Sequence, residues 1–457
     1  MEILLTHGYF LGDDPIEQRI MKPYVPLGIL SIGTYLSQKG FAVKIFDSTF
    51  QSIDAFQNYM QIHKPPVVGI YINMMTKFSA LKMISIAKLF GAIVVVGGPE
   101  PASYAEEFID HGVDIVVIGE GEITLESVLH QIRIGSSDYS EIDGIIFRED
   151  GNIIRTEPRA FISELDQLPI PDRSQIDVTP YLEAWQKHHG YTSLSVISMR
   201  GCPYTCSWCS HAVYGESYRR RSAHLVADEI ELLQSTFHPD LFWFADDVFT
   251  INHKWLFDFE KELLQRKIKI KYECITRADR MNESVVSAMK NTGCIRLWIG
   301  SESGSQKILD SMSRGVQVEQ VQSMTKLAQK NGIEVGMFIM LGYKDEISDD
   351  IERTIRHLKI ARPEHVLTTI AYPIKGTAFY QEIESRLEIP QTDWSEWNDR
   401  MIDFTGRYSK KYYWYANRRI VNEAKWSRLM NNEQKDWFSI GLSFSKAKLA
   451  QIGMKLS

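Results

Sequence analysis

Short apolar runs alternate with longer segments of helical periodicity over the first 135 residues. The apolar runs have the length and composition of strands buried on both faces: Ile3–Leu5, Ala42–Phe46, Val67–Ile72, Ile93–Val96 and Ile115–Ile118. Between them, apolar residues recur at helical spacing: Leu27–Gln38, Thr76–Phe90, Ala102–His111 and Ile123–Ile132. This alternation predicts a doubly wound, Rossmann-like α/β domain over residues 1–135.

The same alternation returns over residues 191–385. Six strands are predicted there: Ser193–Ser198, Leu241–Phe244, Ile270–Ile275, Ile295–Ile299, Glu334–Met340 and Val366–Ala371. Strands that alternate with helices in this way indicate a parallel (β/α) barrel. Residues 136–190 predict a hairpin and a proline-punctuated linker between the two domains, and residues 386–457 predict a helical C-terminal region.

Three cysteines follow the first predicted barrel strand at the spacing C-x3-C-x2-C: Cys202, Cys206 and Cys209. Thiolates this close together indicate a metal site on a loop that leaves a strand. Three ligands, unlike the four of a closed structural zinc site, leave a position open for a small molecule. On an iron–sulfur cluster, three cysteines would leave one iron free. Zinc with His211 as the fourth ligand is the alternative.

The cysteine spacing, with the aromatic Trp208 just before the third cysteine, resembles the radical S-adenosylmethionine (SAM) superfamily. The resemblance implies that the three cysteines hold a 4Fe–4S cluster, whose open iron takes the amino and carboxylate groups of SAM. One-electron reduction would then cleave SAM to a 5′-deoxyadenosyl radical. The six predicted strands match the partial (β/α)6 barrel of this superfamily.

Polar residues stand at the carboxyl ends of the predicted barrel strands, where barrel chemistry is located. The resemblance implies that Asp246 and Asp247 contact the amino group of SAM, and that Glu302 and Ser303 lie by its ribose and methionine parts. Arg277 is expected to pair with the methionine carboxylate or with an acidic substrate. No residue of the chemical step itself is predicted.

Small or polar residues also end three strands of the N-terminal domain, where doubly wound sheets bind ligands. These residues are Asn73 and Thr76, then Gly97, Gly98 and Pro99, then Gly119, Glu120 and Gly121. No G-x-G-x-x-G follows the first strand, so a dinucleotide is not expected.

This half resembles the cobalamin-binding domain of radical SAM enzymes in Pro26–Leu30, Gly97–Pro99 and Asp114–Glu122. The resemblance implies that the two glycine-rich turns lie beside the corrin and its nucleotide tail. The D-x-H-x-x-G signature is absent, so no histidine from that motif ligates cobalt. A domain that only packs against the barrel is the alternative.

Composition narrows the remaining choices. The net charge of −7 argues against general nucleic-acid binding, and five cysteines, three of them clustered, do not make a disulfide framework. Neither a signal-peptide pattern nor an apolar run of membrane-spanning length is present, so a cytoplasmic enzyme is expected. From Gly406 onward, eleven Lys and Arg stand against three Asp and Glu, a difference of +8 (11 − 3), interleaved with aromatic residues. Such a region predicts a helical cap or, alternatively, a docking face for a lipid-like or anionic substrate or for a membrane surface.

The two resemblances together imply a cobalamin-dependent radical SAM enzyme, and we expect it to methylate an unactivated carbon under anaerobic conditions. The expected partners are a small-molecule or lipid-like substrate and an electron donor such as a reductase, flavodoxin or ferredoxin. One alternative keeps the cofactors but performs a radical oxidative cyclisation, as in the anaerobic magnesium-protoporphyrin ester cyclases. The other is a zinc-stabilised binding protein without turnover.

Overall fold

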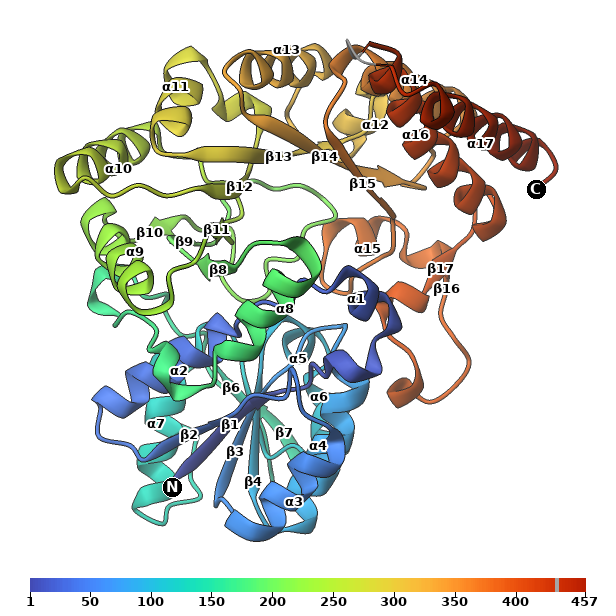
Figure 1. The fold of residues 1–457 in the computed structure, drawn as a ribbon. Helices are drawn as coiled ribbons and strands as arrows, with labels where there is room; N and C mark the ends of the chain where they lie inside the picture. Colours follow the sequence, from blue (N-terminus) through green and yellow to red (C-terminus); the bar gives the residue numbers. More distant parts are fainter. Residues whose placement is uncertain (432–434) are drawn as a thin grey trace. The chain divides into compact units, whose positions relative to one another are not determined.

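The computed structural model describes residues 1–431 and 435–457 of the chain, which fold into two compact units (Figure 1). The first unit consists of Met1–Pro203, Ser210–Asp240 and Pro390–Asp399. The second consists of Tyr204–Cys209, Leu241–Ile389 and Arg400–Ser457. The chain therefore crosses between the units at both ends of Tyr204–Cys209, between Asp240 and Leu241, and at both ends of Pro390–Asp399.

A seven-stranded sheet forms the centre of the first unit, with strands in the order β2-β1-β3-β4-β5-β6-β7. Its strands are β1 (Ile3–His7), β2 (Val43–Phe46), β3 (Val67–Tyr71), β4 (Ile93–Gly97), β5 (Ile115–Val117), β6 (Ile145–Glu149) and β7 (Asn152–Arg155). The first five pair in parallel, which confirms the doubly wound prediction. The order of winding reverses between β1 and β3, where such sheets bind ligands.

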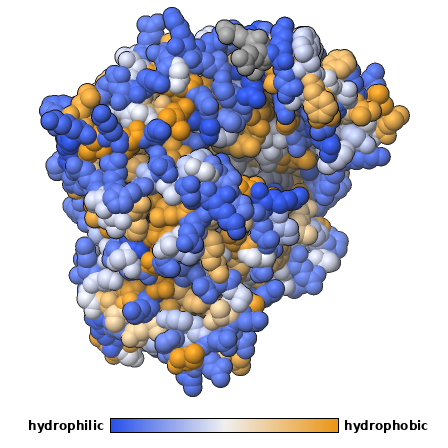
Figure 2. Space-filling view, viewed as in Figure 1, coloured by the Kyte–Doolittle hydropathy of each residue, from blue (hydrophilic) through white to orange (hydrophobic). Residues whose placement is uncertain are grey.

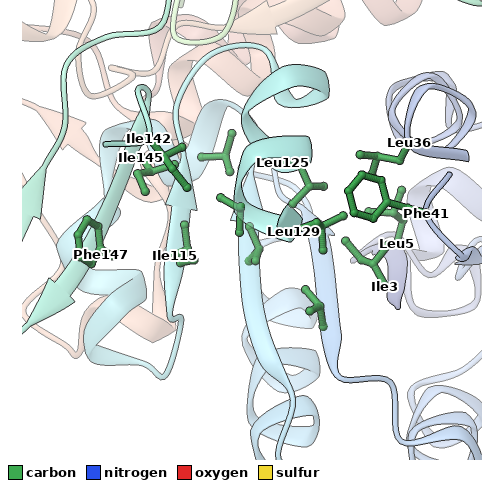
Figure 3. Packing of buried hydrophobic residues seen from close by; sticks show 14 residues of the cluster. Ile3, Leu5, Leu36, Phe41, Ile115, Leu125, Leu129, Ile142, Ile145 and Phe147 are labelled. Carbon is green, nitrogen blue, oxygen red and sulfur yellow. The ribbon is translucent and has the colours of Figure 1, made fainter. Parts of the chain in front are cut away.

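Helices cover the sheet and bury its apolar residues. They are α2 (Leu27–Gln38), α3 (Ile53–His63), α4 (Lys77–Leu89), α5 (Pro99–Ser103), α6 (Ala105–Asp110) and α7 (Gly121–Arg133). Helices α2 and α7 pack together on the sheet (Figure 3), where Leu36 and Leu129 are buried against Leu5 and Ile115. Full burial of a side chain of this size contributes roughly 1.5–3 kcal/mol.

The predicted hairpin forms as β6 and β7, and β6 extends the sheet antiparallel to β5. Ile145 and Phe147 alternate toward the apolar core, which explains why the hairpin joins the sheet instead of standing apart from it. Asp150 and Gly151 both have positive φ, as a two-residue hairpin turn requires.

Short elements complete the first unit: α1 (Pro15–Ile20), α8 (Thr179–His189), β8 (Ser193–Val196), β9 (Met199–Arg200), β10 (Arg219–Arg220) and α9 (Ala223–Phe237). Strand β8 is the predicted strand that leads into the cysteine loop. Helix α8 is tied to the sheet domain because Tyr181 donates to Asp47 and Trp185 donates to the carbonyl of Pro23.

In the second unit, five parallel strands lie side by side in the order β11-β12-β13-β14-β15. They are β11 (Leu241–Phe244), β12 (Tyr272–Thr276), β13 (Cys294–Glu302), β14 (Glu334–Leu341) and β15 (His365–Ile370). The helices between them are α10 (His253–Arg266), α11 (Glu283–Asn291), α12 (Gln306–Ser311), α13 (Val318–Lys330) and α14 (Ser348–Ala361). Cys274 and Cys294 are buried on or beside these strands, as predicted.

After β15 the second unit continues with α15 (Ala378–Glu382), the short strands β16 (Leu387–Glu388) and β17 (Asp403–Phe404), and the helices α16 (Lys410–Asn431) and α17 (Trp437–Lys455). The predicted helical C-terminal region is therefore confirmed in its described residues. Among those residues, none of the helices combines the length and apolar character needed to cross a bilayer.

The segment Pro390–Asp399 returns to the first unit and is held there by Lys77. The Lys77 side chain is buried, and its Nζ donates to the carbonyls of Trp394 at 2.6 Å and Trp397 at 2.5 Å. The ammonium also lies 3.5 Å from the ring centre of Trp394, a cation–π contact. One buried lysine thus anchors a segment more than three hundred residues away in sequence.

Candidate cofactor-binding sites

A pocket of about 720 Å³, including its open mouth, lies at the carboxyl ends of the parallel strands of the first unit. Its wall includes Gly97 and Gly98 after β4, Gly119 and Gly121 after β5, and Gly28 at the start of α2. The remaining wall is mainly aliphatic. A largely apolar pocket with few polar groups suits a flat organic ligand of cofactor size.

Gly98 could not be replaced without disturbing this wall. Its φ of 115° and ψ of −179° belong to a backbone region that essentially only glycine occupies. A Cβ at this position would lie 2.4 Å from the carbonyl oxygen of Ile72. The turn therefore presents bare backbone to the pocket, which lets a bulky ligand approach closely.

Two buried carboxylates and two arginines form an ionic network at the rim of the pocket. Arg200 pairs with Glu120 at 2.7 Å and with Glu122 at 2.5 Å, and Arg219 pairs with Glu120 at 2.6 Å. Burial alone would raise the pKa of Glu122, but the Arg200 guanidinium outweighs it and holds that pKa below its usual range. Glu120 lines the pocket as predicted from its position, but its carboxylate is occupied by protein cations.

Asn73 and Thr76 have a local role in the structure. The Asn73 carboxamide oxygen accepts from the backbone N–H groups of Met75 and Thr76, which closes the turn before α4. Pro99 begins the short helix α5. None of these three is among the described residues that line the pocket.

In the second unit, the cysteine loop is fixed on the ends of its strands and helices. The Ser207 hydroxyl lies 2.7 Å from that of Tyr343, and the Ser207 N–H donates to the carbonyl of Met312. Trp208 packs on the buried cluster that contains Met312, Tyr343 and Phe379. The aromatic residue before the third cysteine is therefore an anchor for the loop.

Cys206 lies buried beside two guanidinium groups. Arg277 Nη1 is 3.7 Å and Arg314 Nη1 is 3.9 Å from the Cys206 Sγ atom. Arg277 is in turn held by Asp279 and by the carbonyl of Arg314, and stacks at 3.6 Å on the ring of Tyr204. Two positive charges therefore lie beside a sulfur of the kind that ligates iron in iron–sulfur clusters.

Glu302 ends β13 close to the same arginines. Its side chain is buried and its backbone has a φ of 59°, which is uncommon for a residue other than glycine. Burial raises the pKa of Glu302 to about 7, against the opposing effect of Arg314 and Arg277. A buried carboxylate that titrates near neutrality in a strained backbone position is typical of a functional site.

The other residues predicted to bind SAM lie at the expected strand ends, but they differ in exposure and in their hydrogen-bond partners. The Ser303 hydroxyl is 3.2 Å from that of Thr354 and accepts from the Ser305 N–H, so protein groups already engage it. Asp246 is buried after β11, whereas Asp247 is exposed. Cys209 is exposed and Cys202 is partly exposed.

In the described part of the chain, no three His, Cys, Asp or Glu side chains converge as a preformed metal cage. The donor set nevertheless fits an iron–sulfur cluster because of the charges around Cys206. Guanidinium groups at hydrogen-bonding range of a cluster sulfur are among the features that set its reduction potential.

Sequence reasoning missed Arg314 and Tyr204. Arg314 follows the short helix α12, not a strand, and donates to the carbonyl of Gly300 at 2.8 Å. The left-handed residues on either side of it, Ser313 and Gly315, mark a tight turn that could have drawn attention to it. Tyr204 lies inside the cysteine motif, in which the family resemblance gives a role only to the cysteines and to Trp208.

Two family models match the chain. The radical SAM superfamily model matches residues 196–358, and the B12 binding domain model matches residues 19–129. A methyltransferase of Pyrococcus horikoshii, itself uncharacterised, is 30% identical over 365 residues, which cover 78% of this chain and 78% of that protein. An anaerobic magnesium-protoporphyrin IX monomethyl ester cyclase of Rubrivivax gelatinosus is 24% identical over 406 residues, covering 85% and 71%.

The fold has a solved counterpart in TsrM, a radical SAM methyltransferase of Kitasatospora setae. That structure, with tryptophan substrate and a SAM analogue bound, matches with a TM-score of 0.76 at 16% identity and covers 99% of this chain and 98% of that one. Another TsrM structure holds cobalamin and a [4Fe-4S] cluster and matches with a TM-score of 0.72 at 17% identity, covering 86% and 77%.

The class of protein follows from the matched regions: the cysteine loop lies in the region matched by the radical SAM model, and the glycine-walled pocket is lined mainly by residues of the region matched by the B12-binding model. The chain is therefore a radical SAM enzyme with a corrin-binding domain. The chain belongs to this family, the cobalamin-dependent radical SAM enzymes. Its cofactors are accordingly a 4Fe–4S cluster, SAM and cobalamin, and its curated relatives include methyltransferases.

Proposed function

We propose that this enzyme transfers a methyl group from SAM to an unactivated carbon of a small or lipid-like molecule. The observation that carries the proposal is the presence, in one chain, of the glycine-walled pocket and of the buried group formed by Cys206, Arg277, Arg314 and Glu302. When bound, the cluster supplies an electron that cleaves SAM, and the corrin carries the methyl group. The protein has to hold both and exclude water and oxygen.

Residues of the first unit would hold the corrin. Gly97, Gly98, Gly119 and Gly121 would give it close access to the backbone, and the aliphatic wall would cover its face. The ionic network of Arg200 with Glu120 and Glu122 would keep the rim rigid while it is desolvated, because each of its charges is paired.

The cysteine loop would hold the cluster, and residues of the second unit would hold SAM. Cys206 and Cys209, with Cys202 from the same loop, would ligate iron, and Arg277 and Arg314 would lie beside the Cys206 sulfur. Glu302 has the acceptor atoms that ribose hydroxyls require, and Asp246 and Asp247 would face the SAM ammonium. Arg277 is already paired with Asp279. We therefore propose that it lies beside the cluster and does not bind an acidic group of the substrate.

Methyl transfer is favoured over cyclisation by the relatives. The methyltransferase from Pyrococcus is 30% identical over 78% of both chains, whereas the Rubrivivax cyclase is 24% identical. One turnover would consume two molecules of SAM and two electrons. One SAM would yield methionine and 5′-deoxyadenosine after hydrogen abstraction from the substrate, and the other would yield S-adenosylhomocysteine as its methyl group replaces that hydrogen.

The need for electrons and for an oxygen-sensitive cluster also supports a flavodoxin-, ferredoxin- or reductase-type donor and a cytoplasmic, anaerobic setting. Clustered thiolates of this kind persist only where thiols stay reduced.

Two variants separate the two halves of this function. Anaerobically reconstituted protein is given SAM and a strong reductant, and both nucleoside products are measured. Cys206→Ala is expected to abolish 5′-deoxyadenosine but to keep S-adenosylhomocysteine formation on the reduced corrin. Gly98→Leu is expected to abolish S-adenosylhomocysteine formation but to keep 5′-deoxyadenosine formation, because the added side chain would disturb the wall of the corrin pocket. The wild type forming 5′-deoxyadenosine but never S-adenosylhomocysteine, with corrin bound, would instead favour the cyclase-like reaction.

A further inference from the structure

The helix α17 is apolar on its solvent side. Its inner face packs on α16, where Ala447 and Ala450 are buried and Gly453 lies against the ring of Tyr415. The exposed apolar residues of the helix are Trp437, Phe438, Leu442, Phe444, Leu449, Ile452 and Leu456. Phe438 is 80% exposed and Leu449 is 67% exposed, so the described residues of the chain do not cover either side chain. Figure 2 shows orange side chains among blue ones at the right-hand end of these C-terminal helices.

These exposed residues form one stripe along the helix. At 3.6 residues per turn, positions 438, 442, 449, 452 and 456 fall within a sector of about 80°. Trp437 and Phe444 lie beyond one edge of this sector and widen the exposed apolar side to about 160°. The buried positions, such as Ala447 and Ala450, lie on the other side of the helix. A helix with apolar groups on both sides is unusual at a protein surface and calls for a second apolar partner.

Positive charge borders the stripe. On the same helical projection, Lys446 lies beyond one edge of the 80° sector, and Lys448 and Lys455 lie between the other edge and Phe444, all exposed. The helix contains no Asp or Glu. The chain from Gly406 onward has a net charge of +8 (11 − 3), whereas the rest has −15 (40 − 55). The cations are thus gathered where the apolar stripe is exposed.

We propose that α17 lies on the surface of an anionic lipid bilayer, with its stripe in the acyl–headgroup boundary and its lysines reaching lipid phosphates. Exposed apolar residues beside lysines, on a helix that does not span a bilayer, favour a position at the lipid–water interface. A second copy is the poorer occupant because an isologous contact would bring the two sets of lysines together. The inference is independent of the reaction that the enzyme catalyses.

Vesicle flotation of the full reconstituted protein tests this proposal. Phosphatidylcholine vesicles with and without 30% phosphatidylglycerol are compared. Binding is expected on the anionic vesicles and roughly fivefold weaker for each lysine changed in Lys446→Gln and Lys448→Gln, which each remove one positive charge. The triple variant Phe438→Ser, Leu449→Ser, Ile452→Ser is expected to lose binding at least about twentyfold.

A matched control changes equally exposed apolar residues elsewhere, Ile62→Ser and Leu264→Ser, which are 74% and 63% exposed. This control should bind as the wild type does, and all variants should keep the thermal melting temperature. Sedimentation without lipid measures self-association. The proposal is overturned if no vesicle is bound, if the α17 variants bind as well as the control, or if they only dissociate a dimer.

Discussion

Buried charge around Cys206 is the feature of the second unit that sequence spacing alone does not reveal. The two guanidinium groups face one sulfur from different segments, β12 and the turn after α12. Neither charge is solvated, so each acts on the cluster sulfur through a medium of low effective dielectric constant. We therefore expect the two arginines to influence the reduction potential of a cluster bound at Cys206.

Removing one of these charges should make the cluster harder to reduce. Arg314→Gln is expected to lower the midpoint potential by on the order of tens of millivolts, because a reduced cluster loses a stabilising cation. Arg314→Lys should recover most of the shift. A redox titration followed by electron paramagnetic resonance measures both, with exposed Arg356→Gln as control. Equal potentials in all four proteins would show that Arg314 is only structural.

Glu302 should make stability depend on pH. Its pKa is raised to about 7 from 4.5, so the folded state holds this proton more tightly than the unfolded state. The unfolding free energy should therefore fall as pH rises from about 4.5 to 7, by about 3 kcal/mol. Glu302→Gln removes the titration.

Thermal unfolding of the cofactor-free protein at pH 5 and pH 8 measures this effect. Glu302→Gln should melt higher than the wild type at pH 8 and close to it at pH 5. The matched control Glu283→Gln changes an exposed carboxylate of α11 and should follow the wild type at both values. An equal difference in melting temperature between Glu302→Gln and the wild type at both pH values would contradict a raised pKa for Glu302.

The residue scale also marks the limit of sequence reasoning. Arg277 and Glu302 were predictable as candidate site residues because the carboxyl ends of parallel strands lie at one edge of the sheet. Arg314 arrives from a turn after a short helix, and nothing in a linear pattern reports that its side chain folds back beneath β13. The occupied carboxylate of Glu120 escaped prediction for the same reason, since both of its arginine partners lie beyond residue 199.

At the scale of elements, the turn after β4 gives a direct test of the corrin pocket. Gly98→Ala should destabilise the first unit by at least about 2 kcal/mol, because its Cβ would meet the Ile72 carbonyl and its φ is strained for alanine. It should also weaken hydroxocobalamin binding, read from the absorbance of the protein-bound corrin. Gly12→Ala, where a Cβ meets nothing within 4 Å, is the control. Unchanged corrin binding in Gly98→Ala would place the corrin elsewhere.

The anchor at Lys77 gives a second test at this scale. Burial lowers the pKa of Lys77 to about 8, against the pull of Glu100 and Asp399. Lys77→Met removes the hydrogen bonds from Nζ to the carbonyls of Trp394 and Trp397, so the segment Pro390–Asp399 should detach more often.

Chymotrypsin, which cuts after tryptophan, measures this opening. Cleavage in the segment should accelerate at least about tenfold in Lys77→Met, because slow proteolysis follows the open population. Lys82→Met, an exposed lysine on the same helix α4, should leave the rate unchanged. Equal rates in both variants would mean that other contacts hold the segment.

Elements with strong local patterns were predictable. The predicted bounds of α2 and β11 coincide with those observed, because an amphipathic run and a short apolar run between polar residues leave few alternatives. Helix α3 was missed, and the pairing of β6 with β5 and the return of residues 390–399 to the first unit were not foreseen. The strand pairing and the returning segment depend on tertiary contacts, such as those of Lys77, which local periodicity does not report.

At the scale of the whole molecule, the chain combines two α/β units, and the second of them ends in a basic helical region. The acidic body and the basic C-terminal region carry opposite net charges, −15 and +8. Family membership accounts for the two units, whereas the apolar outer side of α17 is a property of the remaining region.

Quantifying 5′-deoxyadenosine after anaerobic reconstitution with iron, sulfide and hydroxocobalamin tests most directly whether this chain is a cobalamin-dependent radical SAM enzyme. The wild type should hold about four irons and one corrin per chain and release 5′-deoxyadenosine from SAM when reduced. Cys206→Ala should keep the corrin but release none. A protein that takes up zinc instead of iron and leaves SAM intact would contradict the assignment.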